Sequence, residues 1–384
     1  MLTHTNLPGR WRLGRTIPLI IGIIFVIDVA ARLFPLDSLS FRAWEAVVRY
    51  HLPCSPFRAN VHYVNDSSYG DLAAMGNLPE YRQYRREIFS TDSFGFRLNS
   101  NVPGPPLKYD AILVGDSMIA GSALNNHETL SARLEQHLRK GVYNGGGGEY
   151  PPTLGPILSL SRRLNLMKGT VLYEYFERED LPPPGVLLSY TGPRTTRDCR
   201  DWRARLSIWY EGFVETSPLQ IVAQKIFRKL QNDLLLPNAS KSEVVIRRLT
   251  NGEPILFYPP DIEGSRRKGP ADVSGLKRLA DELEKNGLRL VVVLVPTKYT
   301  VYRSLLKDDK TGNGETGHYL NAVEASLKQV NVPSVNLLSP FQQKAQESFK
   351  QGSYIYWLDD IHWNAAGVEL AAREIIKKKV IQSH

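Results

Sequence analysis

The regular part of the chain begins near residue 109, where short apolar runs alternate with amphipathic segments. YDAILVGDS at 109–117 predicts a buried strand that ends in a polar turn, and 128–140 has the apolar spacing of an amphipathic helix. Strands alternating with helices of this length predict βαβ units, and so an α/β fold with a doubly wound parallel sheet of about five strands. The same patterns predict strands at 142–144, 169–176, 288–296 and 333–337, and helices at 153–164, 274–286 and 318–329.

The alternation stops between residues 181 and 270. This stretch opens with the turn sequence LPPPG, has an irregular mix of charges and closes with NGEP and PPD turn signals, so we interpret it as an insertion. Its aromatic residues Trp202, Trp209 and Tyr210 could stack on sugar rings or fill a core. Residues 37–108 are expected to form a partly helical lead-in that covers an edge of the main domain. The predicted organisation is an N-terminal membrane segment at 1–36, the lead-in at 37–108, and a sheet domain at 109–384 containing the insertion.

The N-terminal segment resembles a membrane signal. Three arginines within residues 10–15 precede an apolar run at 17–36, but Asp28 interrupts it after only 12 residues free of charge, counted from Thr16. In one interpretation this is an uncleaved single-pass transmembrane helix in which Asp28 and Arg32, four residues apart, neutralise each other. In the other it is a signal peptide cleaved after Ala31. We favour the anchor, because Asp28 is unfavourable beside a cleavage site, and both interpretations place the remainder outside the cytoplasm.

Composition and charge narrow the function classes. The 384 residues are 42% apolar and 23% charged, as in an ordinary folded protein. The net charge is +9, of which the first 36 residues carry +3, and no basic stripe with interleaved aromatics follows, so a nucleic-acid partner is not expected. The two cysteines, Cys54 and Cys199, exclude a cysteine-rich scaffold and leave one disulfide open. No cluster has metal-ligand spacing, so neither a metal nor a cofactor is expected.

The first predicted strand ends in candidate chemistry. Ligands of parallel α/β sheets bind outside the carboxyl ends of the strands, where this strand continues into Gly115, Asp116 and Ser117. A serine there presents its hydroxyl at the sheet edge, with a backbone N–H available to an oxyanion, although a serine that only caps the next turn is the alternative. The Gly-x-Ser-x-Gly pattern is not met because residue 119 is isoleucine, which disfavours the α/β-hydrolase fold.

A serine nucleophile needs a base, and the sequence LDDIHWN near the C-terminus offers one. Asp359 and His362 are spaced by three and can face each other across one turn, while Asp360 is the second choice as the partner of the imidazole. Trp363 and Asn364 either line the site or have structural roles, Asn364 as the N-cap of the last helix and Trp363 in a hydrophobic staple.

Four consecutive glycines, Gly145 to Gly148, follow the second predicted strand. No Gly-Lys-Ser/Thr follows and no Gly-x-Gly-x-x-Gly opens a helix, so this is not a phosphate-binding loop. We expect either a loop whose backbone approaches the substrate closely and offers N–H groups to an oxyanion, or a flexible surface loop.

Together, VGDS, NGGGG and DDIHWN resemble the blocks of the SGNH (GDSL-type) hydrolase superfamily. The resemblance implies Ser117 as nucleophile, His362 as base and Asp359 as the residue that orients it, with N–H groups of Ser117 and of Gly145 or Gly146 forming the oxyanion hole.

The third block departs from the superfamily pattern. Many members have Gly-x-Asn-Asp there, whereas this chain has VLYEYFERED without asparagine. Either Glu174, Glu177 or Arg178 lies near the site in another role, or the oxyanion hole has one donor fewer. Asp116, beside the serine, is a further candidate to line the site.

Four segments restrict the resemblance to one branch of the superfamily. They are TDSFGFR at 91–97, YEYFERE at 173–179, VPTKYTVYR at 295–303 and the DDIHWN ending. They are similar to SGNH-like proteins of bacterial polysaccharide O-acetylation, of the alginate O-acetyltransferase type, over 89–180 and 274–376. This implies a single-pass protein of the bacterial inner membrane whose catalytic domain lies in the periplasm and works with a membrane-bound O-acyltransferase.

The expected activity is acetyl transfer to a polysaccharide or oligosaccharide through an acyl-serine. An esterase acting on a carbohydrate or lipid with the same Ser-His-Asp triad is the alternative. A non-catalytic scaffold of a polysaccharide export complex is the second alternative.

Overall fold

A computed structural model describes residues 10–33, 55–76, 78–100, 108–147, 150–189, 244–307 and 318–381, together with scattered positions between 202 and 226. Cys54, Cys199 and Trp209 lie outside the described residues, so the predictions made for them stay untested. Trp202 and Tyr210 are described and exposed.

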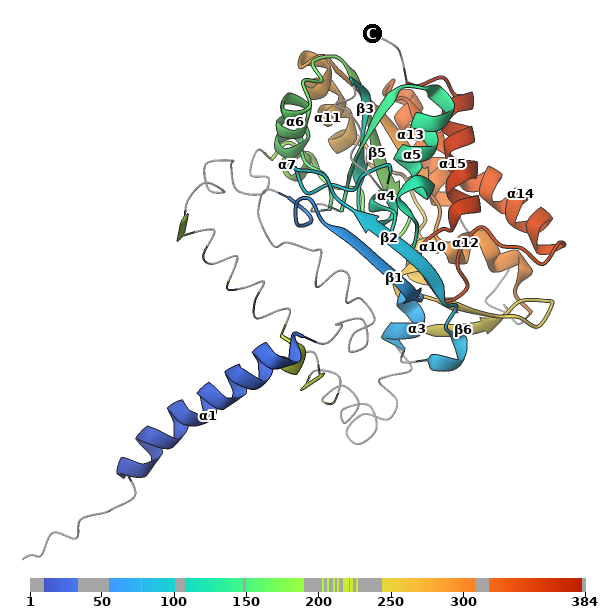
Figure 1. Cartoon of the computed structure of the whole chain (residues 1–384). Coiled ribbons are helices and arrows are strands. Elements are labelled where there is room, and N and C mark those ends of the chain that lie inside the picture. The colour runs from blue at the N-terminus through green and yellow to red at the C-terminus, as the bar shows by residue number, and fades with distance from the viewer. Residues whose placement is uncertain are drawn as a thin grey trace, which may run out of the picture.

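The core of the molecule is a five-stranded parallel sheet, as predicted (Figure 1). The chain enters at β3, adds β4 on one side and then returns to add β5 on the other side. The connection after β3 leads toward β4, and the connection after β5 leads toward β8 on the opposite side. Where two such connections run apart, a crevice forms at the carboxyl ends of the strands. The strands, in spatial order, are β4 (Gly141–Gly146), β3 (Tyr109–Gly115), β5 (Gly169–Phe176), β8 (Leu288–Val295) and β9 (Ser334–Asn336).

Helices cover both faces of this sheet. Successive strand residues point to opposite faces, so Leu172 packs in one core cluster while its neighbours Val171 and Tyr173 pack in the other. All eight residues of β5 are buried, as expected for a central parallel strand. One face carries α5 (Leu130–Leu138), α14 (Leu338–Phe349) and α15 (Ala365–Lys377), and the other carries α6 (Leu154–Arg163), α11 (Ser274–Lys285) and α13 (His318–Gln329).

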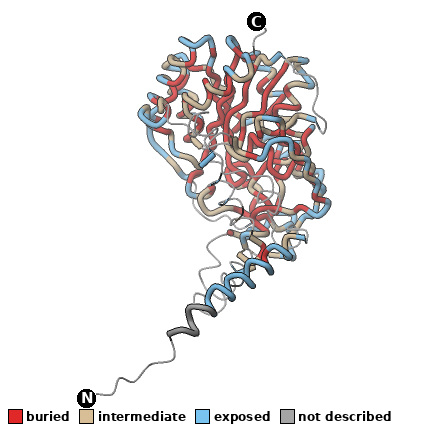
Figure 2. Tube along the Cα trace, turned by 60° about the vertical axis from the view of Figure 1, so that its left-hand side comes forward, coloured by how far each residue is buried: buried red, intermediate tan, exposed pale blue. Residues whose placement is uncertain are grey.

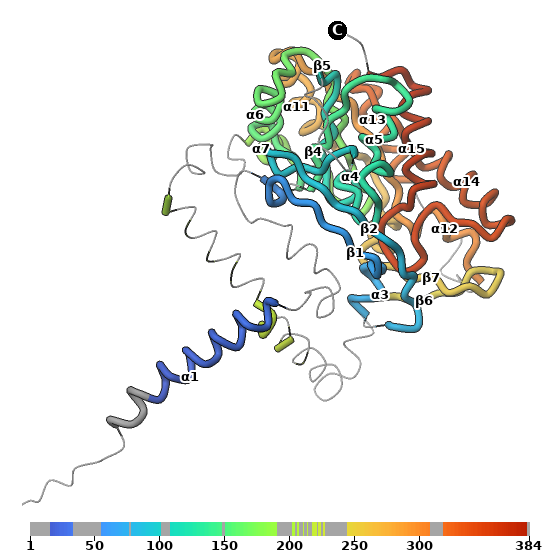
Figure 3. The backbone as a smooth tube through the Cα atoms, in the orientation of Figure 1, coloured from blue at the N-terminus to red at the C-terminus, as the bar shows by residue number. Residues whose placement is uncertain are grey.

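The lead-in segment forms an antiparallel strand pair, β1 (His62–Ser68) and β2 (Arg85–Ser90). Between them lie the short helix α3 (Asp71–Met75) and the turn η2 (Pro79–Tyr81). Figures 1 and 3 show this pair beside the short helix α4 (Ser117–Ala120). The buried Arg97 joins the two regions, because its guanidinium donates to the carbonyl oxygens of Ile88 and Ala120.

The end of the predicted insertion packs against the sheet domain. The antiparallel strands β6 (Val245–Arg248) and β7 (Pro254–Phe257) precede the helix α10 (Pro259–Ser265). The N–H of Leu256 donates to the carbonyl oxygen of Leu358 at 2.9 Å, so this hairpin supports the loop that carries His362. The remaining described elements are α7 (Pro184–Leu187), η3 (Asn126–Glu128), α12 (Lys298–Tyr302) and η6 (Arg303–Leu305).

The N-terminal segment forms the helix α1 (Arg10–Ala31), whose described side chains are mostly exposed (Figure 2). The expected ion pair is present, with Arg32 2.8 Å from Asp28. Within the part of the chain that the structure describes, no helix combines the length and the apolar character that crossing a membrane requires. The predicted transmembrane helix is therefore not supported.

Candidate active site

Ser117 stands at the carboxyl end of β3, as the first residue of α4. Asp116 caps this helix by accepting the N–H of Met118 at 2.7 Å, which fixes the turn in which the serine lies. A Cβ on Gly115 would lie 2.1 Å from Oε2 of Glu174, so only glycine fits before the turn. The Ser117 hydroxyl is 2.8 Å from Nε2 of His362, although 245 residues separate the two in sequence.

The imidazole of His362 is fully buried and held at both nitrogens. Its Nδ1 lies 2.7 Å from Oδ1 of Asp360, and the same oxygen accepts the backbone N–H of His362 at 3.2 Å. These partners assign the proton of the neutral ring to Nδ1, which leaves Nε2 free to accept the serine proton. Ser117, His362 and Asp360 thus form one continuous chain of hydrogen bonds, the arrangement of a serine-based triad.

The expected pairing of Asp359 with His362 is wrong in this structure, and the alternative, Asp360, holds the ring. The carboxylate of Asp359 accepts the backbone N–H groups of Gly70 at 2.7 Å and Gln83 at 2.8 Å, and Arg85 donates to it at 3.0 Å. A spacing of three suits one helical turn, but this loop is a tight non-helical turn closed by the bridge between Tyr356 and Trp363. In this turn the carboxylate of Asp360, two residues before His362 in the sequence, reaches the imidazole.

A buried lysine that the sequence analysis missed holds the same loop. Nζ of Lys298 donates to the carbonyl oxygens of Trp357 at 3.2 Å, Leu358 at 3.2 Å and Asp360 at 2.6 Å. Burial lowers the pKa of Lys298 to about 7, although the carboxylates of Asp360 and Asp359 favour its charged form. Its position just after a central buried strand, within VPTKYTVYR, was the available signal.

The two glycines predicted for the oxyanion hole are engaged within the protein. Gly145 lies in the parallel ladder opposite Val114, and the N–H of Gly146 donates to Oδ1 of Asn144 at 3.1 Å. A Cβ on Gly146 would lie 2.3 Å from the backbone nitrogen of Ala120, so the glycine allows α4 to approach β4 closely. The N–H of Ser117, at the first position of α4, has no acceptor within that helix and remains the donor best placed for an oxyanion.

The candidates at the end of β5 do gather beside the turn of Ser117. Glu174 is buried and accepts the N–H of Asp116 at 2.9 Å. Burial, reinforced by the charge of Asp116, raises the pKa of Glu174 well above its usual value. Arg178 lies 3.6 Å from Asp116 and 3.2 Å from Asp261, a residue of α10 that the sequence analysis missed. Burial raises the pKa of Asp261 to about 6.

Glu177 lies one step further along the same edge. Its Oε2 accepts the N–H of Thr297 at 2.8 Å, which ties the end of β5 to the turn after β8. Burial is the main cause that raises the pKa of Glu177 to about 7. Its contacts give Glu177 a structural role in joining two strands.

Trp363 and Asn364 have the structural contacts that were one of their two alternatives, and Asn364 also lines a groove beside the site. Oδ1 of Asn364 accepts the N–H groups of Ala366 at 3.0 Å and Gly367 at 3.2 Å, so it is the N-cap of α15. The Trp363 ring is fully buried in the core cluster that also contains Val368.

A second carboxylate faces the imidazole. Oδ2 of Asp71, in α3, lies 3.8 Å from Nδ1 of His362. Asp71, Asp360 and His362 are the set of described residues whose ligand atoms approach closely enough to hold a metal ion. Both ring nitrogens already have hydrogen-bond partners in Asp360 and Ser117, so the set fits a hydrogen-bonded triad with an additional carboxylate better than it fits a metal centre.

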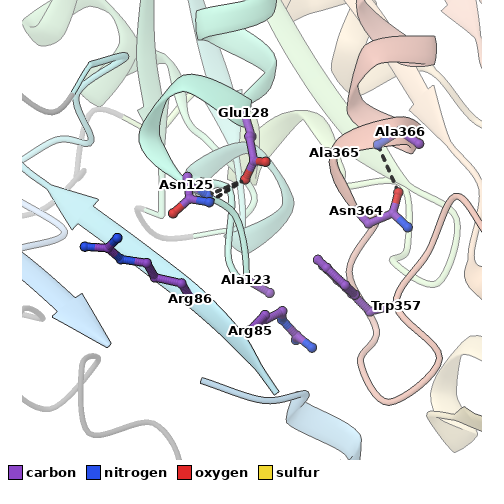
Figure 4. A pocket seen from close by; sticks show the side chains of 9 residues that line it. All are labelled: Arg85, Arg86, Ala123, Asn125, Glu128, Trp357, Asn364, Ala365 and Ala366. Carbon is purple, nitrogen blue, oxygen red and sulfur yellow. Dashed lines mark hydrogen bonds between the residues drawn. The ribbon is translucent and has the colours of Figure 1, made fainter. Parts of the chain in front are cut away.

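A groove of about 470 Å³ adjoins this region. Its walls come from β2, from η3 and from segments on both sides of His362 in sequence. In Figure 4 the Arg85 side chain lies between β2 and the Trp357 ring. Its guanidinium is 4.3 Å from the centre of that ring. The lining residues are Arg85, Arg86, Ala123, Asn125, Glu128, Trp357, Asn364, Ala365 and Ala366.

Comparison with known proteins agrees with the motifs. Residues 257–382 match the family model described as SGNH hydrolase-like domain, acetyltransferase AlgX. The matched part contains Asp360 and His362. Ser117 lies outside it, and its hydroxyl is hydrogen-bonded to His362.

Curated relatives are similar over a comparable length. The alginate biosynthesis protein AlgX of Pseudomonas putida is 32% identical over 109 residues, which are 27% of this chain and 22% of that protein. The probable alginate O-acetylase AlgJ of the same organism is 28% identical over 108 residues, 28% of this chain and 26% of that protein. AlgJ of Pseudomonas syringae pv. tomato is 28% identical over 100 residues, 26% of this chain and 24% of that protein.

The chain thus matches about a quarter of the length of each of these curated relatives. The fold, the motifs and the matched domain agree. The resemblance to the SGNH-type, alginate O-acetyltransferase-like branch is therefore confirmed, and residues 257–382 are the part of the chain that matches the family model.

Proposed function

We propose that this protein is a serine-dependent O-acetyltransferase that esterifies hydroxyl groups of a polysaccharide. The observation that carries the proposal is the chain of hydrogen bonds from Ser117 through His362 to Asp360 at the carboxyl edge of the sheet. Relatives named as an alginate biosynthesis protein and as probable alginate O-acetylases support the choice of acetyl transfer.

The first half of the reaction loads the serine. Nε2 of His362 takes the proton of Ser117 as its oxygen attacks the carbonyl carbon of an acetyl donor, and Asp360 stabilises the imidazolium that forms. The N–H of Ser117 donates to the oxyanion of the tetrahedral intermediate. The bond from the carbonyl carbon to the donor's leaving group then breaks, the leaving group takes the proton from His362, and an acetyl-serine remains.

The second half repeats these steps with the acceptor. His362 removes the proton of a sugar hydroxyl, the hydroxyl oxygen attacks the acetyl-serine, and the Ser117 oxygen leaves with the proton held on Nε2. A membrane-bound O-acyltransferase as the source of the acetyl group, and a periplasmic location, stay predictions that complete this proposal.

The test uses the full chain, an activated acetyl ester and an oligosaccharide of an acidic polysaccharide. Intact-mass analysis should detect one added acetyl group in the wild type, mapped to Ser117, and none in Ser117→Ala. Product analysis should then detect acetylated sugar. Acetyl-enzyme that releases only acetate would support an esterase with the same triad. A wild type that is folded yet never acetylated would contradict catalysis and favour a scaffold.

A further inference from the structure

Arg85, in the segment that precedes the sheet domain, donates hydrogen bonds to two adjacent carboxylates. Its Nη1 donates to Asp359 at 3.0 Å and its Nη2 donates to Asp360 at 2.8 Å, while the Trp357 ring lies against its guanidinium. The Arg85 side chain is only 8% exposed. A planar guanidinium holds its N–H donors in a fixed fork that suits two neighbouring carboxylates, whereas the donors of an ammonium group are not held in one plane.

The same segment makes further contacts with the loop of His362. The N–H groups of Leu72 and Ala73 donate to the carbonyl oxygen of Asp359, each at 3.1 Å, and Asp71 faces Nδ1 of His362. A Cβ on Gly70 would lie 2.1 Å from that carbonyl oxygen, so the two backbones are in close contact. The described residues between Gly70 and Arg85 therefore contact Asp359 and Asp360, and Asp71 among them faces the imidazole.

We infer that Arg85 and Asp71 are positioning residues of the active site, which hold Asp360 against His362 and balance the charge that the imidazole meets. The inference rests on the proposed function, because it assigns these residues to the reaction of Ser117. Neither residue lies in the region matched by the family model or in a block that the motif analysis used.

The two residues act on the imidazole with opposite sign. The cation of Arg85 opposes a positive charge on His362, whereas the carboxylate of Asp71 favours it. Among the described residues, Asp360 contacts Nδ1 of this ring and the charge of Asp261, from α10, also acts on it. Lys298, from α12, donates to the carbonyl oxygen of Asp360. All three residues are present in both variants, and Arg85→Gln also removes the cation bound to Asp360.

The experiment compares Arg85→Gln, Asp71→Asn and a control, Arg373→Gln. Arg373, on α15, has a side chain that is 70% exposed and paired with Glu369, so this substitution removes the same charge at the surface and outside the groove. Arg85→Lys keeps the charge but not the planar fork of donors, and serves if Arg85→Gln does not fold. Two readouts are measured against pH: the rate of Ser117 acetylation by an activated ester, and the NMR titration of the imidazole signal that is absent in His362→Gln.

Arg85→Gln should lower kcat about 10²-fold with little change in KM, because the catalytic groups lose their alignment. The acid limb of its rate profile and the His362 titration should move to higher pH. Asp71→Asn should move both to lower pH. Arg373→Gln should resemble the wild type, and Arg85→Lys should lose rate with a smaller shift.

The inference fails if the folded Arg85 variants match Arg373→Gln, or if the Arg85 and Asp71 substitutions shift the titration in the same direction. The NMR titration needs no turnover, so it tests the positioning roles even if the ester never acetylates Ser117. Absence of acetylation in the wild type would instead contradict the proposed function.

Discussion

Replacing Asp360 by asparagine should separate the charge of the triad from its geometry. Oδ1 of Asp360 accepts two N–H groups, from the backbone and from Nδ1 of His362, while Oδ2 faces Nη2 of Arg85. The amide of Asp360→Asn will therefore keep its oxygen toward the two N–H groups of His362. Its NH₂ group will face Nη2 of Arg85, so two donors meet and the hydrogen bond to Arg85 is lost. The imidazole keeps its tautomer and loses only the negative charge beside it.

The size of the loss follows from that orientation. A hydrogen bond to a charged group contributes about 1.5–3 kcal/mol, which corresponds to roughly 10- to 10²-fold in rate. The Arg85 cation, now without its Asp360 partner, disfavours the imidazolium further, so we expect kcat to fall about 10²- to 10³-fold. An asparagine that forced the other tautomer would cost about 10⁴-fold.

Asp359→Asn is the matched comparison. Asp359 touches no atom of the imidazole ring in the contacts above, and its Oδ2 accepts two backbone N–H groups. We expect kcat within about fivefold of the wild type and a free energy of unfolding lower by about 1–3 kcal/mol. Single-turnover release of p-nitrophenolate from p-nitrophenyl acetate measures the acylation rate, and urea denaturation measures the stability. A folded Asp359→Asn that loses as much rate as Asp360→Asn would refute the assignment of Asp360.

Two further predictions concern stability. Glu177→Gln tests burial of a carboxyl group: since the pKa of Glu177 is raised from 4.5 to about 7, ionisation costs folding free energy as the pH rises through that interval and the full cost remains above it. The variant should therefore gain on the order of 3 kcal/mol relative to the wild type between pH 4 and pH 8, measured by urea denaturation at both pH values; an unchanged difference would show that Glu177 is not buried as described. Asn364→Ala removes the acceptor for two N–H groups of α15 and should lower the free energy of unfolding by about 1 kcal/mol. Thermal denaturation measures this change, and a melting temperature equal to that of the wild type would contradict it.

The sheet and the two reacting residues could be predicted because they depend on local pattern. The apolar run at Leu288–Val295 can only be a buried strand, and Ser117 and His362 stand in short polar motifs beside predicted strands or helices. The choice between Asp359 and Asp360 could not be made this way. Donors nearly 290 residues away in sequence, among them the N–H of Gly70, decide which carboxylate is free to hold the ring.

The local sequence pattern also could not predict which charged residues are buried. Lys298 and Asp261 look like surface residues in the sequence, and only the packing of α10 and α12 beneath the loop of His362 shows that they are enclosed. The lead-in was expected to cover an edge of the sheet. The lead-in also contributes Arg85 and Asp71 to the site. Their contacts link residues far apart in sequence, so the hydrophobic pattern could not predict them.

The site draws on three stretches of chain, near residues 70–85, 115–117 and 357–362, and this has a consequence for the order of folding. Contacts across 245 to 289 residues close very long loops, and the entropy cost of closing them is greatest before the strands between them have paired. A chain that has been made only as far as β5 holds Ser117 without a base. The nucleophile therefore acquires its base only after the C-terminal loop has been made and has joined the fold.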